Sequence, residues 1–174
     1  MALNLSGTTL STPSTFGLIA GFLATKRSLA PRVLIEITET AEIGDIAAAN
    51  QGVQALRAMG YKVGLDDFGA GAASFQYLHA FEIDFVKFDG KLIRNLGKTP
   101  REDMLVAGLV KLCGELGIET VAEGIENAEL LKRARALGFA LGQGYHLGKP
   151  DREIAVPTPA ARTSKRRGEE VSWG

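Results

Sequence analysis

Apolar residues recur along the chain in two alternating patterns, one with the period of a helix and one as short continuous runs. Residues 46–59 and 105–116 carry the helical period, with apolar side chains at Ile46, Ala49, Val53, Leu56 and Met59 and at Leu105, Leu109, Leu112 and Leu116. Short runs typical of buried strands stand around them: VLIEITET, YKVGLDDFG, FVKFDG, ETVAEG and FALGQGY. This alternation predicts right-handed βαβ units around a parallel sheet, which is an α/β fold.

The same sequence pattern marks the transition from helix to strand three times, in ALRAMGYKVGLDD, KLCGELGIETVAEG and RARALGFALGQGY. Each time a glycine, Gly60, Gly117 or Gly138, follows the last residue of helical period. A residue with positive φ commonly ends a helix, and glycine adopts this conformation without a Cβ clash. Asp45 and Asn127 precede two of the helices, where their side chains can accept hydrogen bonds from the first turn.

With the N-terminal ALNLSG, the chain holds about six strands, each followed by a helix or a long connection. A full barrel of this class has eight such units and roughly 200–250 residues. The 174 residues are therefore expected to form an incomplete TIM-like (β/α) barrel of about six of the eight βα units. Open sheet edges invite pairing, so we expect a homodimer or a partner chain that completes the barrel.

The end of the chain differs in composition from the rest. Residues 157–174 read PTPAARTSKRRGEEVSWG, which is polar and has no period, and this predicts a disordered tail after a barrel domain over residues 1–156. The basic run Lys165–Arg167 is open to two interpretations, contact with an acidic partner or a solvated tail.

Composition limits the binding partners and the cellular compartment that we expect for the chain. Lys and Arg number 20 and Asp and Glu number 20, so net charge gives no argument for binding a nucleic-acid polymer or a membrane surface. Cys113 is the only cysteine, which excludes an intrachain disulfide and favours a reducing compartment. The apolar stretch 16–24 is too short to span a membrane, and no signal peptide is evident. A cytoplasmic protein without a membrane segment is expected.

Polar side chains interrupt the apolar strands near their carboxyl ends. They are Asn4, Glu36, Glu39, Asp66, Asp67, Lys87, Asp89, Glu123 and Gln143. In a barrel of parallel strands these ends share one mouth, which is where barrel enzymes place their chemistry. Clustered carboxylates repel one another unless a cation neutralises them, and a set of hard oxygen ligands selects Mg²⁺, Mn²⁺ or Ca²⁺.

Several of these residues also admit a purely structural interpretation. Asn4 can satisfy a backbone group, and Glu39 can hydrogen-bond a neighbouring loop. Lys87 can serve as an ion-pair partner for one acid, and Gln143 can be a buried amide without a ligand. The adjacent Asp66–Asp67 pair is the hardest to explain without a cation, because two buried acids in series repel each other.

Six motifs in order resemble the EAL domain family, whose members bind or hydrolyse the bacterial messenger cyclic-di-GMP. They are NLSG, EITET, DDFGAG, KFDGKLI, AEGIE and QGYHLGKP, and they run from Asn4 to Pro150. The resemblance implies a modified TIM barrel with two divalent cations, Mg²⁺ or Mn²⁺. It also implies metal-assisted attack of water on one phosphodiester bond, which gives the linear dinucleotide.

Roles follow from the resemblance position by position. It implies that Asn4, Glu36 and Asp66 are ligands of the first metal, and that Asp66, Asp67 and Glu123 surround the second.

The same resemblance gives roles to residues outside the metal ligands. Lys87 is implied to orient or activate the attacking water, with Glu123 as the second catalytic residue. Glu39 is implied to hold the loop after Asp67, and Gln143 to line the mouth. Further substrate or loop positions within the motifs are Gly69, Gly71, Asp89 and Pro150.

The chain also departs from the family pattern. It contains no Glu-Ala-Leu motif, so the family's first metal-ligating glutamate is missing from these residues. The loop GAGAAS carries Ala70, Ala72 and Ala73 where polar or aromatic residues are usual, and KFDGKLI carries Gly90 where a larger residue is common.

Three functions therefore stay open at this point. The first is an active cyclic-di-GMP phosphodiesterase, which the retained Lys87, Glu123 and aspartates favour. The second is an inactive cyclic-di-GMP receptor or a protein-interaction module in bacterial second-messenger signalling, which the missing glutamate and the altered loop favour. The third is an unrelated metal-dependent barrel lyase, which the order of the motifs disfavours.

Overall fold

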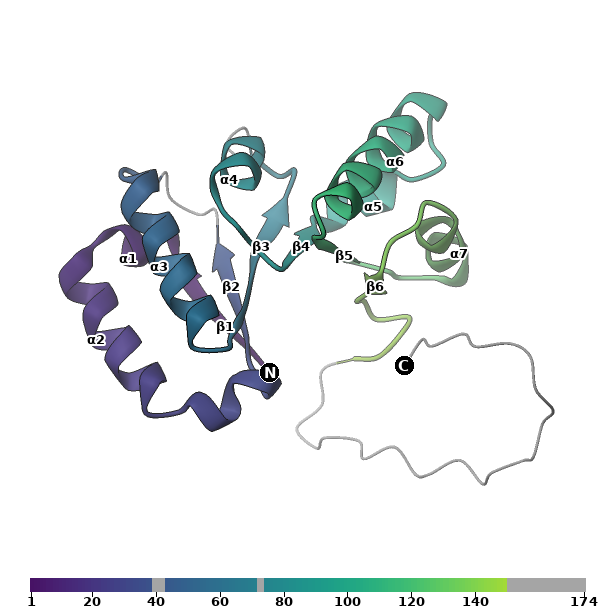
Figure 1. Ribbon diagram of the computed structural model, residues 1–174. Helices are drawn as coiled ribbons and strands as arrows, with labels where there is room; N and C mark the ends of the chain where they lie inside the picture. Colours follow the sequence, from purple (N-terminus) through teal and green to yellow (C-terminus); the bar gives the residue numbers. More distant parts are fainter. Residues whose placement is uncertain (39–42, 72–73, 150–174) are drawn as a thin grey trace, which may run out of the picture.

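A computed structural model describes residues 1–38, 43–71 and 74–149. Six strands form one sheet in chain order, and every neighbouring pair is parallel (Figure 1). The strands are β1 (Ala2–Ser6), β2 (Leu34–Thr38), β3 (Lys62–Phe68), β4 (Phe85–Phe88), β5 (Glu119–Ala122) and β6 (Leu141–Gly142). The predicted parallel α/β sheet of six βα units is confirmed.

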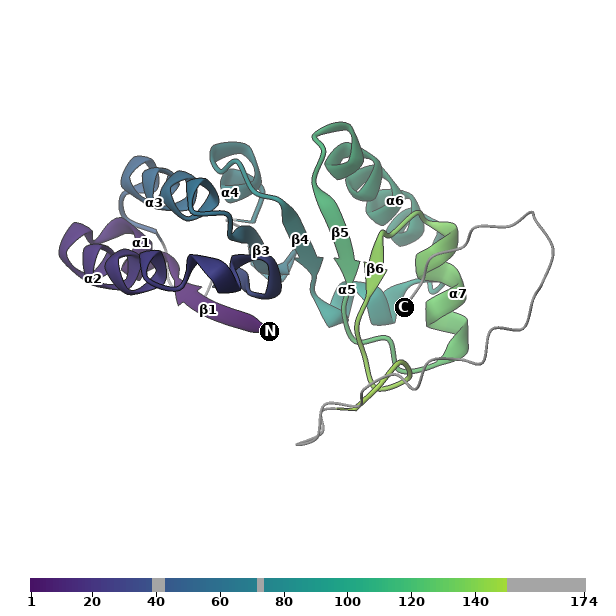
Figure 2. The same ribbon diagram turned by 60° about the horizontal axis from the view of Figure 1, so that its bottom comes forward.

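Helices connect successive strands, and two of them fall on the ranges 46–59 and 105–116 that carry the helical period. They are α1 (Gly7–Ser11), α2 (Pro13–Ala24), α3 (Ile46–Ala58), α4 (Ser74–Ala80), α5 (Gly90–Asn95), α6 (Pro100–Glu115) and α7 (Ala128–Ala136), with a 3₁₀ helix at Arg27–Arg32. The first three α-helices lie at the β1 end of the sheet and the last three at the β6 end (Figures 1 and 2). None of the helices in the described part is long and apolar enough to cross a membrane.

One face of the sheet packs into the core and the other is open. Residues that alternate along the strands are almost fully buried in the main apolar cluster: Ile35, Ile37, Val63, Leu65, Val86 and Phe88. The residues between them, such as Glu36 and Lys87, line a cleft of about 530 Å³ instead. Because successive side chains of a strand point to opposite faces, Glu36 and Lys87 lie on this second face, where Gln143 also lines the cleft.

The predicted helix ends are confirmed. Gly60, Gly117 and Gly138 have φ values of 94°, 72° and 88°, so each ends its helix in the left-handed conformation. At the other ends, Asp45 Oδ1 accepts a hydrogen bond from Ala48 N at 2.9 Å, and Asn127 Oδ1 accepts one from Leu130 N at 2.9 Å.

The apolar period of α6 predicts the helix correctly but does not mark its buried face. Leu109 is buried, whereas Leu105, Leu112 and Leu116 are 56%, 40% and 57% exposed. The face that packs on the sheet carries Val106, Leu109, Val110 and Cys113. Two apolar stripes run along this helix, and tertiary packing rather than periodicity selects between them.

The strands are shorter than the sequence suggests. Asp89, expected within the fourth strand, lies beyond β4 and is the N-cap of α5, where its Oδ1 accepts a hydrogen bond from Lys91 N at 2.7 Å. Glu123 and Gln143 each follow the last residue of their strand by one position. All three still lie at carboxyl ends, as expected.

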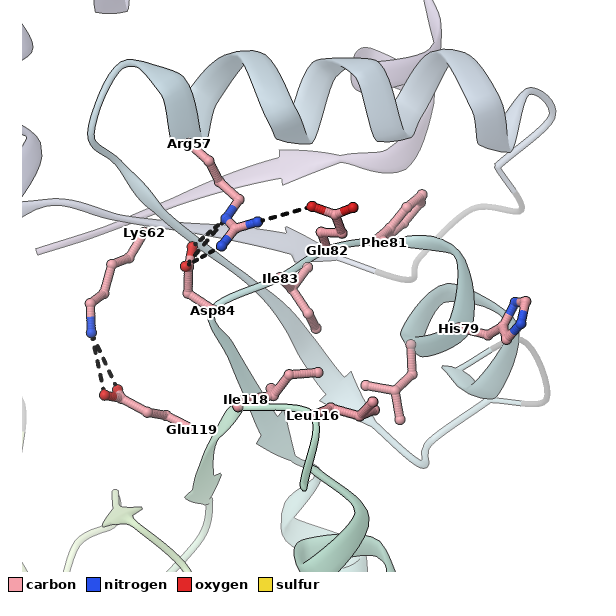
Figure 3. Close-up of a pocket in the computed structure, with 12 residues that line it drawn as sticks. Arg57, Lys62, His79, Phe81, Glu82, Ile83, Asp84, Leu116, Ile118 and Glu119 are labelled. Atoms are coloured by element: carbon pink, nitrogen blue, oxygen red, sulfur yellow. Dashed lines mark hydrogen bonds and ion pairs between the residues drawn. The ribbon is translucent and has the colours of Figure 1, made fainter. Parts of the chain in front are cut away.

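Ion pairs fix the opposite end of the sheet, around a polar hollow of about 480 Å³ (Figure 3). Arg57, near the end of α3, donates from Nε and Nη2 to Asp84 Oδ1 at 3.2 and 3.1 Å. Asp84 Oδ2 also accepts a hydrogen bond from Val63 N at 2.9 Å. Lys62 and Glu119 form a second, more exposed pair at 3.4 Å. These contacts tie α3 to the starts of β3 and β4, and β3 to β5, at the end of the sheet opposite to the carboxyl ends.

Three predictions lie outside the described residues. They are the domain boundary at residue 156, the tail over residues 157–174, and the positions of Glu39 and Pro150.

Candidate functional site

Lys87 is the centre of the polar cluster on the open face. It lies in β4 and is 8% exposed. Its Nζ contacts Glu123 Oε1 at 2.7 Å, Asp66 Oδ1 at 2.8 Å and Glu36 Oε2 at 3.3 Å. Three carboxylates from three other parts of the sheet therefore converge on one ammonium group.

Sheet register brings these carboxylates to Lys87. Glu36 in β2 lies opposite Gly64 in β3, and Asp66 follows two residues later on the same face. The pairing of β3 with β4 shifts between Leu65 and Phe68, an irregularity that falls on the two aspartates. Such bulges bend a strand locally and re-aim its side chains. Beyond β5, Glu123 is held by its own backbone, since its N donates to Phe88 O at 3.2 Å.

Asp67 has an unusual backbone conformation. Its φ of 53° is the only positive value at a non-glycine residue among the described residues. Aspartate tolerates this left-handed region better than most residues, but the conformation is disfavoured and the surrounding structure must maintain it. The strain falls on a residue of the acidic cluster.

Asp66, Asp67 and Glu123 together can hold a metal ion. One carboxylate oxygen from each lies within 4.8 Å of the others. Burial raises the pKa of Glu123, and the neighbouring charges of Asp66 and Asp67 raise it further, although Lys87 opposes the shift. A cation at this position would relieve that repulsion, and carboxylate oxygens are the ligands that hard divalent cations prefer.

Lys87 is held in its charged form. Burial alone would lower its pKa, but the hydrogen bonds and charges of Asp66 and Glu123 outweigh burial and raise the pKa above its ordinary value. The lysine is therefore a hydrogen-bond donor in this arrangement and not a proton acceptor.

The remaining predicted residues lie around this cluster. Asn4 is exposed and pairs in register with Glu36 across β1 and β2. Gln143 is exposed and lines the same cleft as Glu36 and Lys87, while its backbone joins the Ala122 and Ile125 backbones. The residues after Asp67 include Gly69, with a φ of 89°, and the exposed Gly71.

Gly64 is a residue that sequence reasoning missed. It lies between Glu36 and Phe85 in register, and a Cβ at this position would overlap the Phe85 ring and carbonyl oxygen. Its absent side chain lets β3 and β4 approach beneath the acidic cluster. The signal was a lone glycine inside an apolar strand, which typically marks a close approach.

Comparison with known proteins decides the family. The model of the EAL domain matches residues 1–150. The chain belongs to the EAL domain family. The unrelated barrel lyase is thereby excluded.

Several relatives that the chain resembles are named cyclic di-GMP phosphodiesterases. The chain is 35% identical over 150 residues to the cyclic di-GMP phosphodiesterase PdeB of Shewanella oneidensis, which covers 86% of this chain and 18% of that protein. It therefore spans about a fifth of the length of this curated relative.

Solved EAL domains share the fold. The crystal structure of the EAL domain of Mycobacterium smegmatis DcpA matches with a TM-score of 0.76 and 29% identity, over 86% of this chain and 67% of that one. Klebsiella pneumoniae BlrP1, solved as a manganese and cyclic-di-GMP complex, matches with a TM-score of 0.70 and 36% identity, over 83% of this chain and 37% of that one. Both comparisons identify the six-stranded sheet as part of the TIM-like EAL barrel.

Proposed function

We propose that this EAL domain hydrolyses cyclic-di-GMP to the linear dinucleotide with two divalent cations, Mg²⁺ or Mn²⁺. The observation that carries the proposal is the convergence of Asp66, Asp67 and Glu123 within 4.8 Å beside the buried Lys87. Lys87 brings one positive charge to the carboxylates of Glu36, Asp66 and Glu123, and Asp67 lies beside them, so a cation would neutralise the negative charge that remains. The names of PdeB and of the BlrP1 complex support the choice of nucleotide and of a divalent cation.

The residues present fit divalent cations. Asp66, Asp67 and Glu123 would hold one ion, and Asp66 with Glu36 and Asn4 would contribute to the other. The donors are all oxygen atoms, as Mg²⁺ and Mn²⁺ prefer. When bound, such ions lower the pKa of a coordinated water and stabilise charge on the phosphate.

Other residues would position the attacking water and contact the nucleotide. Lys87 supplies a fixed N–H donor between Asp66 and Glu123, where it would orient the attacking water. Gln143 would contact the nucleotide from the wall of the cleft. Additional proposed substrate or loop positions are Glu39, Gly69, Gly71, Asp89 and Pro150.

We further propose that a second copy or another chain completes the barrel in the cytoplasm. Within the described residues, β1 pairs only with β2 and β6 only with β5, so each offers one unpaired edge. Such edges favour the addition of another strand. Only a different chain would also supply the missing glutamate, because a second copy carries no Glu-Ala-Leu motif either.

The test is incubation of the purified chain with cyclic-di-GMP and Mn²⁺, followed by chromatographic separation of the nucleotides. The matched control is Asp67→Ala. Appearance of the linear dinucleotide in the wild type, and its loss in the control, supports the proposal. Intact nucleotide in both samples contradicts it, and retained binding of that nucleotide would then favour a receptor.

A further inference from the structure

A buried tyrosine joins two connections at the carboxyl end of the sheet. Tyr77, on α4, is 2% exposed, and its ring stacks on Phe81 with centroids 5.6 Å apart. Its hydroxyl oxygen accepts a hydrogen bond from Ile43 N at 3.0 Å. Both groups are buried, so loss of either partner would leave a polar atom unsatisfied. Neither residue belongs to the cluster around Lys87.

Ile43 extends this contact to a third connection. It precedes α3 and is 4% exposed. Gly7, the first residue of α1, packs so closely on it that a Cβ at Gly7 would overlap the Ile43 side chain. The chain segments that follow β1, β2 and β3 therefore meet at Ile43 and Tyr77.

The same helix is connected to the acidic pair. Phe68, which directly follows Asp67, packs edge-on against Phe75 of α4 with ring centroids 5.5 Å apart. A shift of α4 would act through this contact on Asp67, whose positive φ requires support from its surroundings.

We propose that Tyr77 is a positioning residue for the acidic cluster. Its hydroxyl fastens the end of the β2–α3 connection to α4, and α4 in turn holds Asp66 and Asp67 in place through Phe75 and Phe68. The link itself is a property of the metal-free chain, whereas its effect on metal binding rests on the proposed function.

The first test is hydrogen exchange of the full chain without metal, comparing Tyr77→Phe with the wild type. Tyr61→Phe is the matched control, because Tyr61 is also 2% exposed and its hydroxyl also bonds backbone, donating to Leu23 O at 3.0 Å. We expect peptides containing Ile43 and residues 64–71 to exchange about fivefold faster in Tyr77→Phe only. Unchanged exchange at residues 64–71, or an equal change in Tyr61→Phe, overturns the proposal.

The second test is Mn²⁺ binding by both variants, followed by electron paramagnetic resonance. Groups that orient metal ligands typically change affinity tenfold or more, so Tyr77→Phe is expected to bind Mn²⁺ roughly tenfold more weakly and Tyr61→Phe as the wild type does. Equal affinity in Tyr77→Phe and the wild type overturns the positioning role. A wild type that binds no Mn²⁺, with the exchange difference intact, overturns the proposed function and leaves the link through Tyr77 standing.

Discussion

A single buried ammonium group holds the acidic cluster together at the residue scale. Lys87 contacts three carboxylates whose side chains are at most 17% exposed. Removing one partner of a buried ion pair leaves the other charges uncompensated. This lowers the free energy of unfolding by far more than the intact pair contributes to it. In the proposed function, divalent cations would share with Lys87 the neutralisation of this cluster.

Replacing Lys87 by methionine should lower the free energy of unfolding by about 3 kcal/mol, because the carboxylates lose their counter-charge. Added Mn²⁺ should restore part of this loss. Urea denaturation with and without Mn²⁺ measures both effects. The control is Lys62→Met, which breaks the half-exposed pair with Glu119 and should cost less than about 1 kcal/mol. Equal losses in the two variants would contradict this view of the cluster.

Cys113 should be unreactive in the folded chain. It is 0% exposed, and burial raises the pKa of its thiol to about 11. The reactive thiolate is therefore very scarce at pH 8, and unfolding, which returns the pKa toward 9.0, raises the thiolate fraction about a hundredfold and exposes the sulfur. Mass spectrometry after treatment with iodoacetamide should show labelling in urea but not in buffer. Rapid labelling of Cys113 in the native chain would contradict the prediction that burial protects its thiol.

At the scale of elements, the close approach of β3 and β4 depends on Gly64. Substitution Gly64→Ala places a methyl group against Phe85 and should destabilise the chain by about 1–3 kcal/mol through overpacking. In Gly114→Ala on α6 the new methyl group meets open space, so this variant should gain up to about 1 kcal/mol from helix propensity. The urea midpoints of the two variants should move in opposite directions, and a midpoint unchanged in Gly64→Ala would be evidence against close approach.

Elements were predictable from the sequence where their signals are local. Alternating periods, the glycines after helices and the caps at Asp45 and Asn127 involve residues within one turn of each other, and the structure confirms them. The buried face of α6 was not predictable, because two apolar stripes compete and only the sheet decides between them. The contact of Tyr77 with Ile43 joins residues 34 positions apart, and no periodicity reports such a contact.

At the scale of the whole molecule, the predicted site rests on convergence of the strand ends. The motifs placed Glu36, Asp66, Lys87 and Glu123 at these ends, and the structure brings all four together. The register shift between β3 and β4, which falls on Asp66 and Asp67, is not revealed by the sequence.

The open edge near β1 should make the isolated chain associate. Leu18 and Phe22 of α2 are 78% and 63% exposed and lie with Leu3 and Leu5 along an apolar groove. We expect a mass above that of the monomer in sedimentation experiments, and a lower mass for the double variant Leu18→Lys and Phe22→Lys. Met104→Lys, at a residue 75% exposed outside the groove, is the control. A monomeric wild type at all concentrations would argue against association through this edge.

The strand order has a consequence for how the molecule forms. In the part of the chain that the structure describes, each strand pairs only with its neighbours along the chain, from β1 to β6. During synthesis each βα unit can dock on the one already made, as repeats do in a growing solenoid. Glu36 and Asp66 leave the ribosome before Lys87, and Glu123 leaves last of the four. When residues up to Lys87 have emerged, Glu36 and Asp66 can already pair with the Lys87 ammonium group. Glu123 would then add its carboxylate to a lysine that is already held in place.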